Sequence, residues 1–344
     1  MREKINKVTI EDIARVLNIT AATVSRALND HPGIAENTRR IVKETAARLH
    51  YQPNRIASSL RLGRTNILGV IIPSAEINFF GSVIHGIEKI ANQNRYSVLI
   101  YQSNELYEHE KLGVQAFLQA QVDGVLASVS KETINADHFI EIKKRGVPLV
   151  LFDRAIDSLG VPSVVIDDYA GAFAATKHLI DQGCRHIAHI GGQQHVSIFN
   201  QRLKGYIDAL NMHGIAVNED LIVYGRVSVD SGRECMQQLL SLKQTPDAVF
   251  AVEDFTALGA MQTIKDAGRK IPDDIAIIGF ANEQFGEFLT PGLSSVNQQT
   301  VTMGEEAASL LFSELQTADR YQSNPKKIVL EARLVCRASS IKQK

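Results

Sequence analysis

From Asn66 onward, short apolar runs alternate with stretches of helical periodicity, and this alternation restricts the possible folds more than any other feature of the chain. Strands that alternate with helices form parallel sheets with helices on both faces. The runs fall into two series, which predicts an α/β body with two lobes. The first series is NILGVIIP, YSVLIYQ, DGVLAS, VPLVLFD and SVVID, and the second is HIAHIGG, LIVYG, DAVFAV and DIAIIGF.

The first 65 residues differ from this body in charge. They contain twelve Lys or Arg residues and six Asp or Glu residues, a net charge of +6, although the whole chain has a net charge of −1. The remainder therefore carries a net charge of −7. A small cationic region ahead of an acidic body is a weak indication of nucleic-acid binding, since an ordinary solvated surface can have the same charge.

Helix signals within the cationic region predict a helix-turn-helix. Thr9 and Asp12 have the spacing of a capping box, and apolar residues then recur on one helical face. Asn18 tolerates the left-handed conformation that a tight turn needs, and Thr20 can cap a second helix. Two short helices joined by such a turn form a helix-turn-helix, whose second helix fits the major groove of DNA. A third helix is expected over residues 36–49.

Two longer runs resemble a known family. The runs VTIEDIARVLNITAATVSRALND and TRRIVKETAARLHYQPNRIASSLRLGRTNILGVIIP are similar to the N-terminus of the lactose/galactose repressor (LacI/GalR) family of bacterial transcription regulators. The similarity is dense over residues 8–73 and continues more loosely to the end. A T-V-S-R motif followed by Y-x-P-N and A-x-S-L is highly specific to that family.

The resemblance implies a DNA-binding regulator, in particular a dimeric repressor whose affinity for operator DNA is controlled by a small molecule. The implied architecture is an all-α helix-turn-helix head (residues 1–53), a hinge helix or linker (54–64) and a two-lobed core that binds the effector and forms the dimer (65–344). This core resembles the periplasmic sugar-binding proteins, in which the chain crosses between the lobes three times. We therefore expect residues 293–325 to return to the first lobe and the final strand, KIVLEARLVCRAS, to complete the second. The expected partners are a sugar or sugar derivative, a double-stranded pseudo-palindromic operator and a second copy of the chain.

Three residues depart from the family pattern in the head. Asn18 and His50 stand where the family usually has glycine, so both are expected in conformations that glycine adopts more cheaply. Ala35 replaces the usual Ser or Thr cap of the third helix, which is expected to cost that helix about 1 kcal/mol. None of these departures removes a functional group.

The second helix is expected to contact DNA. Its first two outward positions, Ala21 and Ala22, can only touch a thymine methyl group or leave room for water, so we expect them to read little. Arg26 can pair with a guanine and is the main expected source of base discrimination. The remaining expected contacts are Thr23 and Ser25 to bases and Thr20 and Asn29 to phosphates.

The segment NRIASSLRL (residues 54–62) favours a helix but is too short to be stable alone. In the family that it resembles, this is the hinge helix, which forms on operator DNA and inserts leucines into the minor groove. By that resemblance Leu60 is the wedge, with Ile56 and Ala57 on the same apolar side. Arg55 and Arg61 are placed near phosphates. The alternative is that Leu60 only packs the linker against the body.

Ligands of two-lobed α/β proteins bind at the carboxyl ends of strands, so residues there are candidates for effector binding. By the resemblance, Arg202 in FNQRLKGY is the arginine that clamps the effector, and Asp153 in LFDR meets a sugar hydroxyl. Glu253 and Ala281 depart from the family, which commonly has Asn and Asp at these positions. Each strand-end residue could instead be a cap or a loop residue. The candidates are Ser74, Phe79, Phe80, Ser128, Asp153, Arg202, Glu253, Asp254 and Asn282.

Enzymes and metalloproteins lack support in the sequence. There is no G-x-G-x-x-G or G-x-x-x-x-G-K-[ST] loop and no G-x-S-x-G elbow, so we expect neither catalytic residues nor a cofactor. The three cysteines are widely spaced, which disfavours a disulfide framework or a zinc site. His186 and His189 point to opposite faces of a strand, which disfavours a shared metal, and with His195 they are expected to be surface and loop histidines.

A transport-type binding protein is a closer rival, since it shares the fold of the body. It would need a signal peptide, whereas the N-terminal MREKINKVTIEDIAR carries charges where a signal peptide needs an apolar stretch. No run of eighteen apolar residues is present, so no membrane span is expected. These features favour a cytoplasmic regulator that associates with the nucleoid when it binds DNA.

Overall fold

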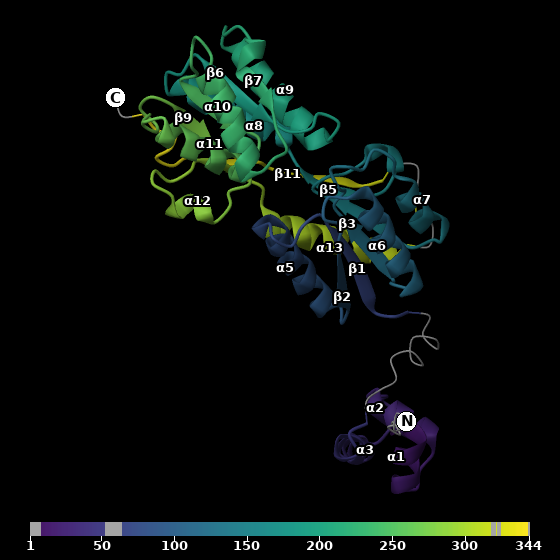
Figure 1. The fold of residues 1–344 in the computed structure, drawn as a ribbon. Helices are drawn as coiled ribbons and strands as arrows, with labels where there is room; N and C mark the ends of the chain where they lie inside the picture. The colour runs from purple at the N-terminus through teal and green to yellow at the C-terminus, as the bar shows by residue number, and fades with distance from the viewer. Residues whose placement is uncertain (1–7, 52–63, 318–320, 322–324, 343–344) are drawn as a thin grey trace, which may run out of the picture. The chain divides into compact units, whose positions relative to one another are not determined.

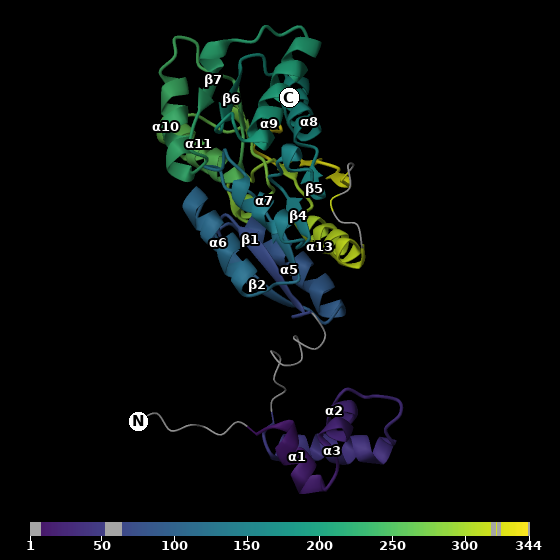
Figure 2. The same ribbon diagram turned by 90° about the vertical axis from the view of Figure 1, so that its right-hand side faces the viewer.

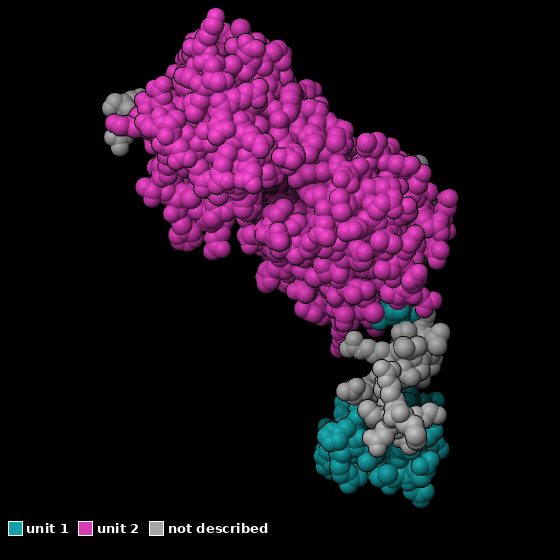
Figure 3. Space-filling view, in the orientation of Figure 1, with its two compact units in different colours: residues 1–65 teal, residues 66–344 magenta. Residues whose placement is uncertain are grey.

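The computed structural model describes residues 8–51, 64–317, 321 and 325–342. The chain divides into two compact units, Met1–Thr65 and Asn66–Lys344, which we call unit 1 and unit 2 (Figure 3). Each unit has a hydrophobic core of its own.

Unit 1 contains, among its described residues, the helices α1 (Ile10–Leu17), α2 (Ala21–Leu28) and α3 (Glu36–Arg48) (Figure 1). Thr9 and Asp12 form the predicted capping box at α1, and the Thr20 hydroxyl accepts a hydrogen bond from the Thr23 amide at the start of α2. The predicted helix-turn-helix and its third helix are therefore present. The helices pack around the buried residues Ile13, Ala14, Val24, Ala27, Val42 and Ala46.

The three departures in the head have the predicted local structure. Asn18 and His50 both have φ 52°, in the left-handed region that favours glycine. Ala35 is the N-cap of α3 and makes no side-chain hydrogen bond to the helix. The first turn of α3 therefore lacks the side-chain acceptor that Ser or Thr would supply.

The first lobe of unit 2 is a six-stranded parallel sheet in the order β11-β5-β4-β3-β1-β2. Side chains of β1 alternate between its faces, so that Leu68 and Val70 pack toward α5 and α13 while Ile71 packs toward α6 and α7. The strands are β1 (Ile67–Ile72), β2 (Ser97–Gln102), β3 (Gly124–Ala127), β4 (Leu149–Phe152), β5 (Ser163–Ile166) and β11 (Lys327–Leu330), and the helices are α5 (Asn78–Gln93), α6 (Tyr107–Gln119), α7 (Asp137–Lys144) and α13 (Thr300–Gln316), with the short 3-10 helix η1 (Asp157–Leu159).

The second lobe is a four-stranded parallel sheet in the order β7-β6-β8-β9, again between two helical layers (Figure 2). Helices α8 and α9 pack on one face around Tyr206 and Phe250, and α10 and α11 pack on the other around Met236 and Met261. A small antiparallel pair, β10 with β12, completes the lobe. The elements are β6 (Ile187–Gly191), β7 (Ile222–Tyr224), β8 (Ala248–Ala251), β9 (Ala276–Ile278), β10 (Ser295–Asn297), β12 (Arg333–Val335), α8 (Asp168–Asp181), α9 (Ser197–Met212), α10 (Val229–Leu240), α11 (Asp254–Asp266), α12 (Phe285–Phe288) and η2 (Glu219–Leu221).

The chain crosses between the lobes three times, after β5, after β10 and after β11. Of residues 293–325, α13 lies in the first lobe as predicted, whereas β10 still belongs to the second. The prediction for the final strand is wrong in part, because KIVLEARLVCRAS forms two strands rather than one. β11 pairs with β5 in the first lobe, and only β12 lies in the second, so the last crossing falls inside this run.

The prediction that His189 is a surface or loop residue is also wrong. Its ring is fully buried and stacks with Tyr206 and Phe250, with centroids 5.2 and 5.0 Å apart. Burial lowers the pKa of His189 to about 4, so the ring is neutral at pH 7. Helices cover both faces of the parallel sheet, which buries strand residues that point either way. His186 and His195 are exposed, as predicted.

No helix in the described part of the chain is long and apolar enough to cross a membrane. Within the same residues, no group of three or more His, Cys, Asp or Glu side chains is arranged to hold a metal ion. Cys184, Cys235 and Cys336 are free cysteines.

Candidate functional site

The outward face of α2 carries the residues that are expected to contact bases and phosphates. Thr20, Arg26 and Asn29 are exposed, and Thr23 and Ser25 are half-buried. The hydroxyls of Thr20 and Thr23 lie 2.9 Å apart, and Asn29 Nδ2 donates to the Ser25 carbonyl at 2.7 Å. These bonds order the polar side chains at both ends of α2, which favours a surface formed before DNA binds.

The two alanines at the start of α2 differ in exposure. Ala22 is exposed, but Ala21 is half-buried and packs against the core of unit 1. The expectation that both face outward is therefore wrong for Ala21. It precedes Val24 by three residues and so shares the helical face of that core residue.

The expected contacts of the hinge, Arg55, Ala57, Leu60 and Arg61, lie outside the described residues, as does Ile56. Their roles stay predictions from the sequence.

A cavity of about 370 Å³ lies between the two lobes of unit 2 and is lined by both. The first lobe contributes Phe79 and Phe80 from α5 and Asp153 from the end of β4. The second lobe contributes Arg202 from α9 and Glu253 from the end of β8. Other lining residues are Lys131, Arg154, Phe199, Phe255, Ala281, Glu283 and Gln298.

Arg202 is fixed in the wall of this cavity, with 2% of its surface exposed. Its Nε donates to Asp168 Oδ1 at 2.8 Å, and its Nη2 lies 2.7 Å from the same oxygen. Its Nη1 donates to the Val252 carbonyl at 2.7 Å, and the guanidinium carbon lies 3.7 Å from the centroid of the Phe280 ring. Burial raises the pKa of Asp168 to about 6, although the charge of Arg202 opposes this shift. Asp168 was not predicted from the sequence.

Asp153 is the second charged candidate in the cavity wall. Its φ of 59° turns the chain directly after β4, and the side chain is buried. Oδ2 accepts a hydrogen bond from the Ser128 hydroxyl at 3.1 Å and lies 3.8 Å from Arg154 Nε. Burial raises the pKa of Asp153 against the attraction of Arg154. Ser128 therefore orients Asp153 and lies outside the lining of the cavity.

Ser74 and Asn282 also lie outside this lining and have structural partners. The Ser74 hydroxyl accepts a hydrogen bond from the Glu76 amide at 3.2 Å, which stabilises the loop after β1. The Asn282 side-chain oxygen accepts a bond from Arg337 Nη2 at 2.9 Å. Ser74 and Asn282 therefore fit the alternative interpretation, in which a strand-end residue stabilises a loop.

Glu253 and Asp254 are adjacent, but only Glu253 lines the cavity. Asp254 is fully buried, where Oδ1 accepts from the Ser295 hydroxyl and Oδ2 from the Glu283 amide, both at 2.7 Å. Glu253 caps α11, and its Oε2 accepts from the Phe255 amide at 2.9 Å. Burial, and then the charge of Asp254, raise the pKa of Glu253 to about 8. Glu253 is therefore mostly protonated at pH 7.

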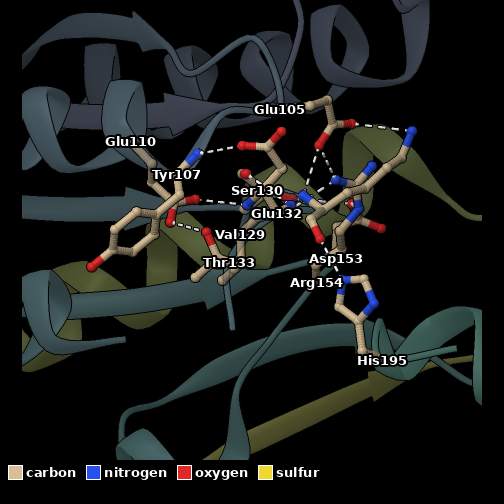
Figure 4. A network of polar contacts seen from close by, with 12 residues as sticks. Glu105, Tyr107, Glu110, Val129, Ser130, Glu132, Thr133, Asp153, Arg154 and His195 are labelled. Atoms are coloured by element: carbon tan, nitrogen blue, oxygen red, sulfur yellow. Dashed lines mark hydrogen bonds and ion pairs between the residues drawn. The ribbon is translucent and has the colours of Figure 1, made fainter. Parts of the chain in front are cut away.

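A polar network that was not predicted borders the cavity and joins the lobes (Figure 4). Glu105 Oε2 accepts from Arg154 Nη1 at 2.7 Å and from the Lys131 amide at 2.9 Å, while Lys131 Nζ lies 3.4 Å from Glu105 Oε1. His195, in the second lobe, has its Nε2 2.6 Å from the Lys131 carbonyl. Of these residues, Arg154 could have been predicted from the sequence, because it directly follows Asp153 at a strand end.

Two family models match the chain. The model of bacterial regulatory proteins of the lacI family matches residues 9–54, and that of the periplasmic binding protein-like domain matches residues 176–340. Catabolite control protein A of Priestia megaterium is 36% identical over 315 residues, which are 91% of this chain and 94% of that protein. The HTH-type transcriptional repressor CytR of Escherichia coli (strain K12) is 34% identical over 308 residues, 90% of each. A solved complex of the transcriptional regulator CelR with cellobiose is 30% identical, with a TM-score of 0.72, covering 97% of this chain and 100% of that chain.

Proposed function

The chain belongs to the lacI family of bacterial regulatory proteins, and from this premise we propose how its parts divide the work: residues 1–53 read operator DNA, residues 54–64 form the hinge, and residues 65–344 bind the effector and dimerise. It is a DNA-binding transcriptional regulator under small-molecule control, not an enzyme. It acts as a homodimer in the cytoplasm, on the DNA of the nucleoid.

The observation that carries the effector role is the cavity whose wall comes from both lobes. Arg202 and Asp153 approach it from opposite lobes, and Phe79 adds an aromatic face. Charged groups that hold hydroxyls beside an aromatic face suit a carbohydrate. The related regulator CelR is solved with cellobiose, which supports the same class of ligand for this chain. The effector is a sugar or sugar derivative.

The mechanism is thermodynamic linkage between the cavity and the DNA-binding head. A ligand that contacts both lobes binds one lobe arrangement more tightly than the other, and so shifts the equilibrium toward it. The affinity for operator changes by the ratio of the two ligand affinities. Arg202 and Asp153 supply contacts from opposite lobes, which makes them sensitive to that arrangement.

The test is operator binding by the full chain, with an operator selected from a random DNA library. Gel shifts in the presence of single sugars, cellobiose included, should show a changed operator affinity for at least one of them. Arg202→Ala should keep operator binding and lose the response, with the fold checked by circular dichroism. The matched control is Arg233→Ala, an exposed arginine of α10 that pairs with Asp230. A full response in Arg202→Ala, or no selectable operator, would overturn the proposal.

A further inference from the structure

The basic side chains of the cavity already have carboxylate partners. Arg202 bonds Asp168, Arg154 and Lys131 share Glu105, and Arg154 Nε also lies 3.8 Å from Asp153 Oδ2. Their positive charge is therefore largely compensated before any ligand enters. An anionic ligand would have to compete with these partners.

The carboxyl groups on the second-lobe side of the cavity have no ion-pair partner among the described residues, and Lys131 acts on Glu253 only from a longer distance. Glu253 accepts from the Phe255 and Thr256 amides at 2.9 and 3.4 Å, and Glu283 Oε1 accepts from the Phe79 amide at 3.2 Å. Among the described residues, no Lys, Arg or His forms an ion pair with either carboxyl group. The Asn78 side chain also donates to Glu283, and a carboxylate can accept more bonds than these donors supply, so acceptor sites are left on both groups.

A buried amide in the same wall also lacks a partner. Gln298 is 4% exposed, and its Oε1 has no hydrogen-bond partner within the described structure. Buried carbonyl oxygens are normally paired, so an unpaired one in the wall of a cavity is a candidate acceptor for a donor in the ligand. Gln298 lines the same cavity as Glu253 and Glu283, so three acceptors border one space.

The charges around Glu253 make that space attractive to a cation. Burial raises its pKa first, followed by the negative charges of Asp254 and Glu283, while the attraction of Lys131 acts in the opposite direction. The pKa of Glu283 is raised as well, again chiefly by burial. A bound cation would favour the ionised form of Glu253, and the ring of Phe255, which lines the same cavity, would add to the stabilisation of that cation.

We propose that the effector carries a protonated amine, which binds at Glu253 and Glu283 with the side-chain oxygen of Gln298 as a third acceptor. An ammonium group has three N–H donors and no acceptor, so its bonding capacity matches these three groups. This inference rests on the proposed sugar effector and narrows it to an amino sugar, whose hydroxyls face Asp153 and Arg202. Hydrogen bonds to charged groups are the stronger ones, so the amine should tighten binding about tenfold to a hundredfold over the matching hydroxyl.

The test is calorimetric titration of the full chain with matched pairs: glucosamine against glucose, galactosamine against galactose, and mannosamine against mannose. At least one amine should bind about tenfold or more tightly than its parent sugar, and its N-acetyl derivative should lose that advantage. Glu253→Gln should remove the preference, while Glu234→Gln, an exposed carboxyl of α10, should keep it.

Operator gel shifts with the same sugars separate the two levels of the proposal. If parent sugars bind as tightly as the amines and change operator affinity, the amine inference is wrong and the regulatory function stands. A preference for the amine that survives Glu253→Gln also overturns the inference. If no sugar of either series binds or changes operator affinity, the sugar effector itself is wrong.

Discussion

Replacing Asp168 with Asn should destabilise unit 2 strongly, because it leaves a cation buried without its counter-charge. Asn keeps the shape of Asp but removes the negative charge that lies 2.7–2.8 Å from the guanidinium of Arg202. Arg202 is 2% exposed and cannot deprotonate in a protein. It would retain a neutral amide oxygen at position 168, the Val252 carbonyl and the rings of Phe280 and Phe199, none of which carries a negative charge. Breaking a buried pair in this way costs about 3–5 kcal/mol.

The opposite variant, Arg202→Met, should lose less from charge burial. The carboxyl left behind has a pKa of about 6 even beside the arginine, so it can take up a proton. Neutralising it at pH 7 costs at most about 1.4 kcal/mol, which corresponds to one pKa unit. The double variant has no charge at either position and should therefore be more stable than Asp168→Asn alone.

Urea unfolding at pH 7 measures these differences. The chain has no tryptophan, so far-ultraviolet circular dichroism is the suitable signal. Asp181→Asn is the matched control, because Asp181 lies on the same helix in an exposed pair with Lys177 and should matter by about 0.5 kcal/mol or less. A loss below about 1 kcal/mol for Asp168→Asn, or a double variant no more stable than that single one, would refute the reasoning.

Leu60→Gly should weaken binding to the selected operator much more than binding to random DNA, because a wedge acts only where DNA is kinked; equal weakening of both in titrations would show that Leu60 is no wedge. Arg26→Ala should erase a preferred guanine in each half-site, and Ala22→Gln should create a new preference at the base that it faces. Operator selection from a random library checks both, and unchanged selected sequences would contradict these roles. The free energy of unfolding should fall as pH rises from about 4.5 to about 8, since the folded state keeps a proton on Glu253 that the unfolded state releases. Urea unfolding across this range should show a smaller fall in Glu253→Gln, and an identical fall would contradict the assignment.

The strand-end rule identified much of the cavity but could not tell which side chains reach it. Phe79, Asp153 and Glu253, which it selected, line the cavity, because the ends of parallel strands meet at one edge of a sheet. It also selected Asp254, whose side chain turns the other way at the start of α11. Adjacent residues diverge at a helix start, and this direction depends on tertiary contacts such as the one to Ser295.

Some missed residues had a signal and others did not. Asp168 follows β5 in SVVIDDY, so it lies at a strand end and satisfies the same rule as the other candidates. Glu105 and Arg154 are 49 residues apart, and their pairing is set by the packing of separate elements. No local pattern encodes such a partner.

The pattern of apolar residues also did not predict burial correctly where burial depends on the layers packed around a strand. The alternation of side chains along a strand places His186 and His189 on opposite faces of the sheet. It does not show that helices cover both faces and so bury His189. The run KIVLEARLVCRAS reads as one strand, yet it is shared between two sheets. Its division follows from where the chain must cross, which apolar periodicity does not record.

The three crossings between the lobes limit how the lobes can move as rigid bodies. Two bodies joined by a single connection can bend, twist and slide, whereas three connections oppose twisting and sliding and leave rotation about one axis. β11 pairs with β5, so two of the three crossings leave the first lobe from neighbouring strands. Because one rotation between the lobes remains, the differential affinity of a ligand in the cavity acts on a single displacement. Shifting such an equilibrium from 1:99 to 99:1 takes about 5.5 kcal/mol of differential affinity, which lies within the binding free energy of one small molecule.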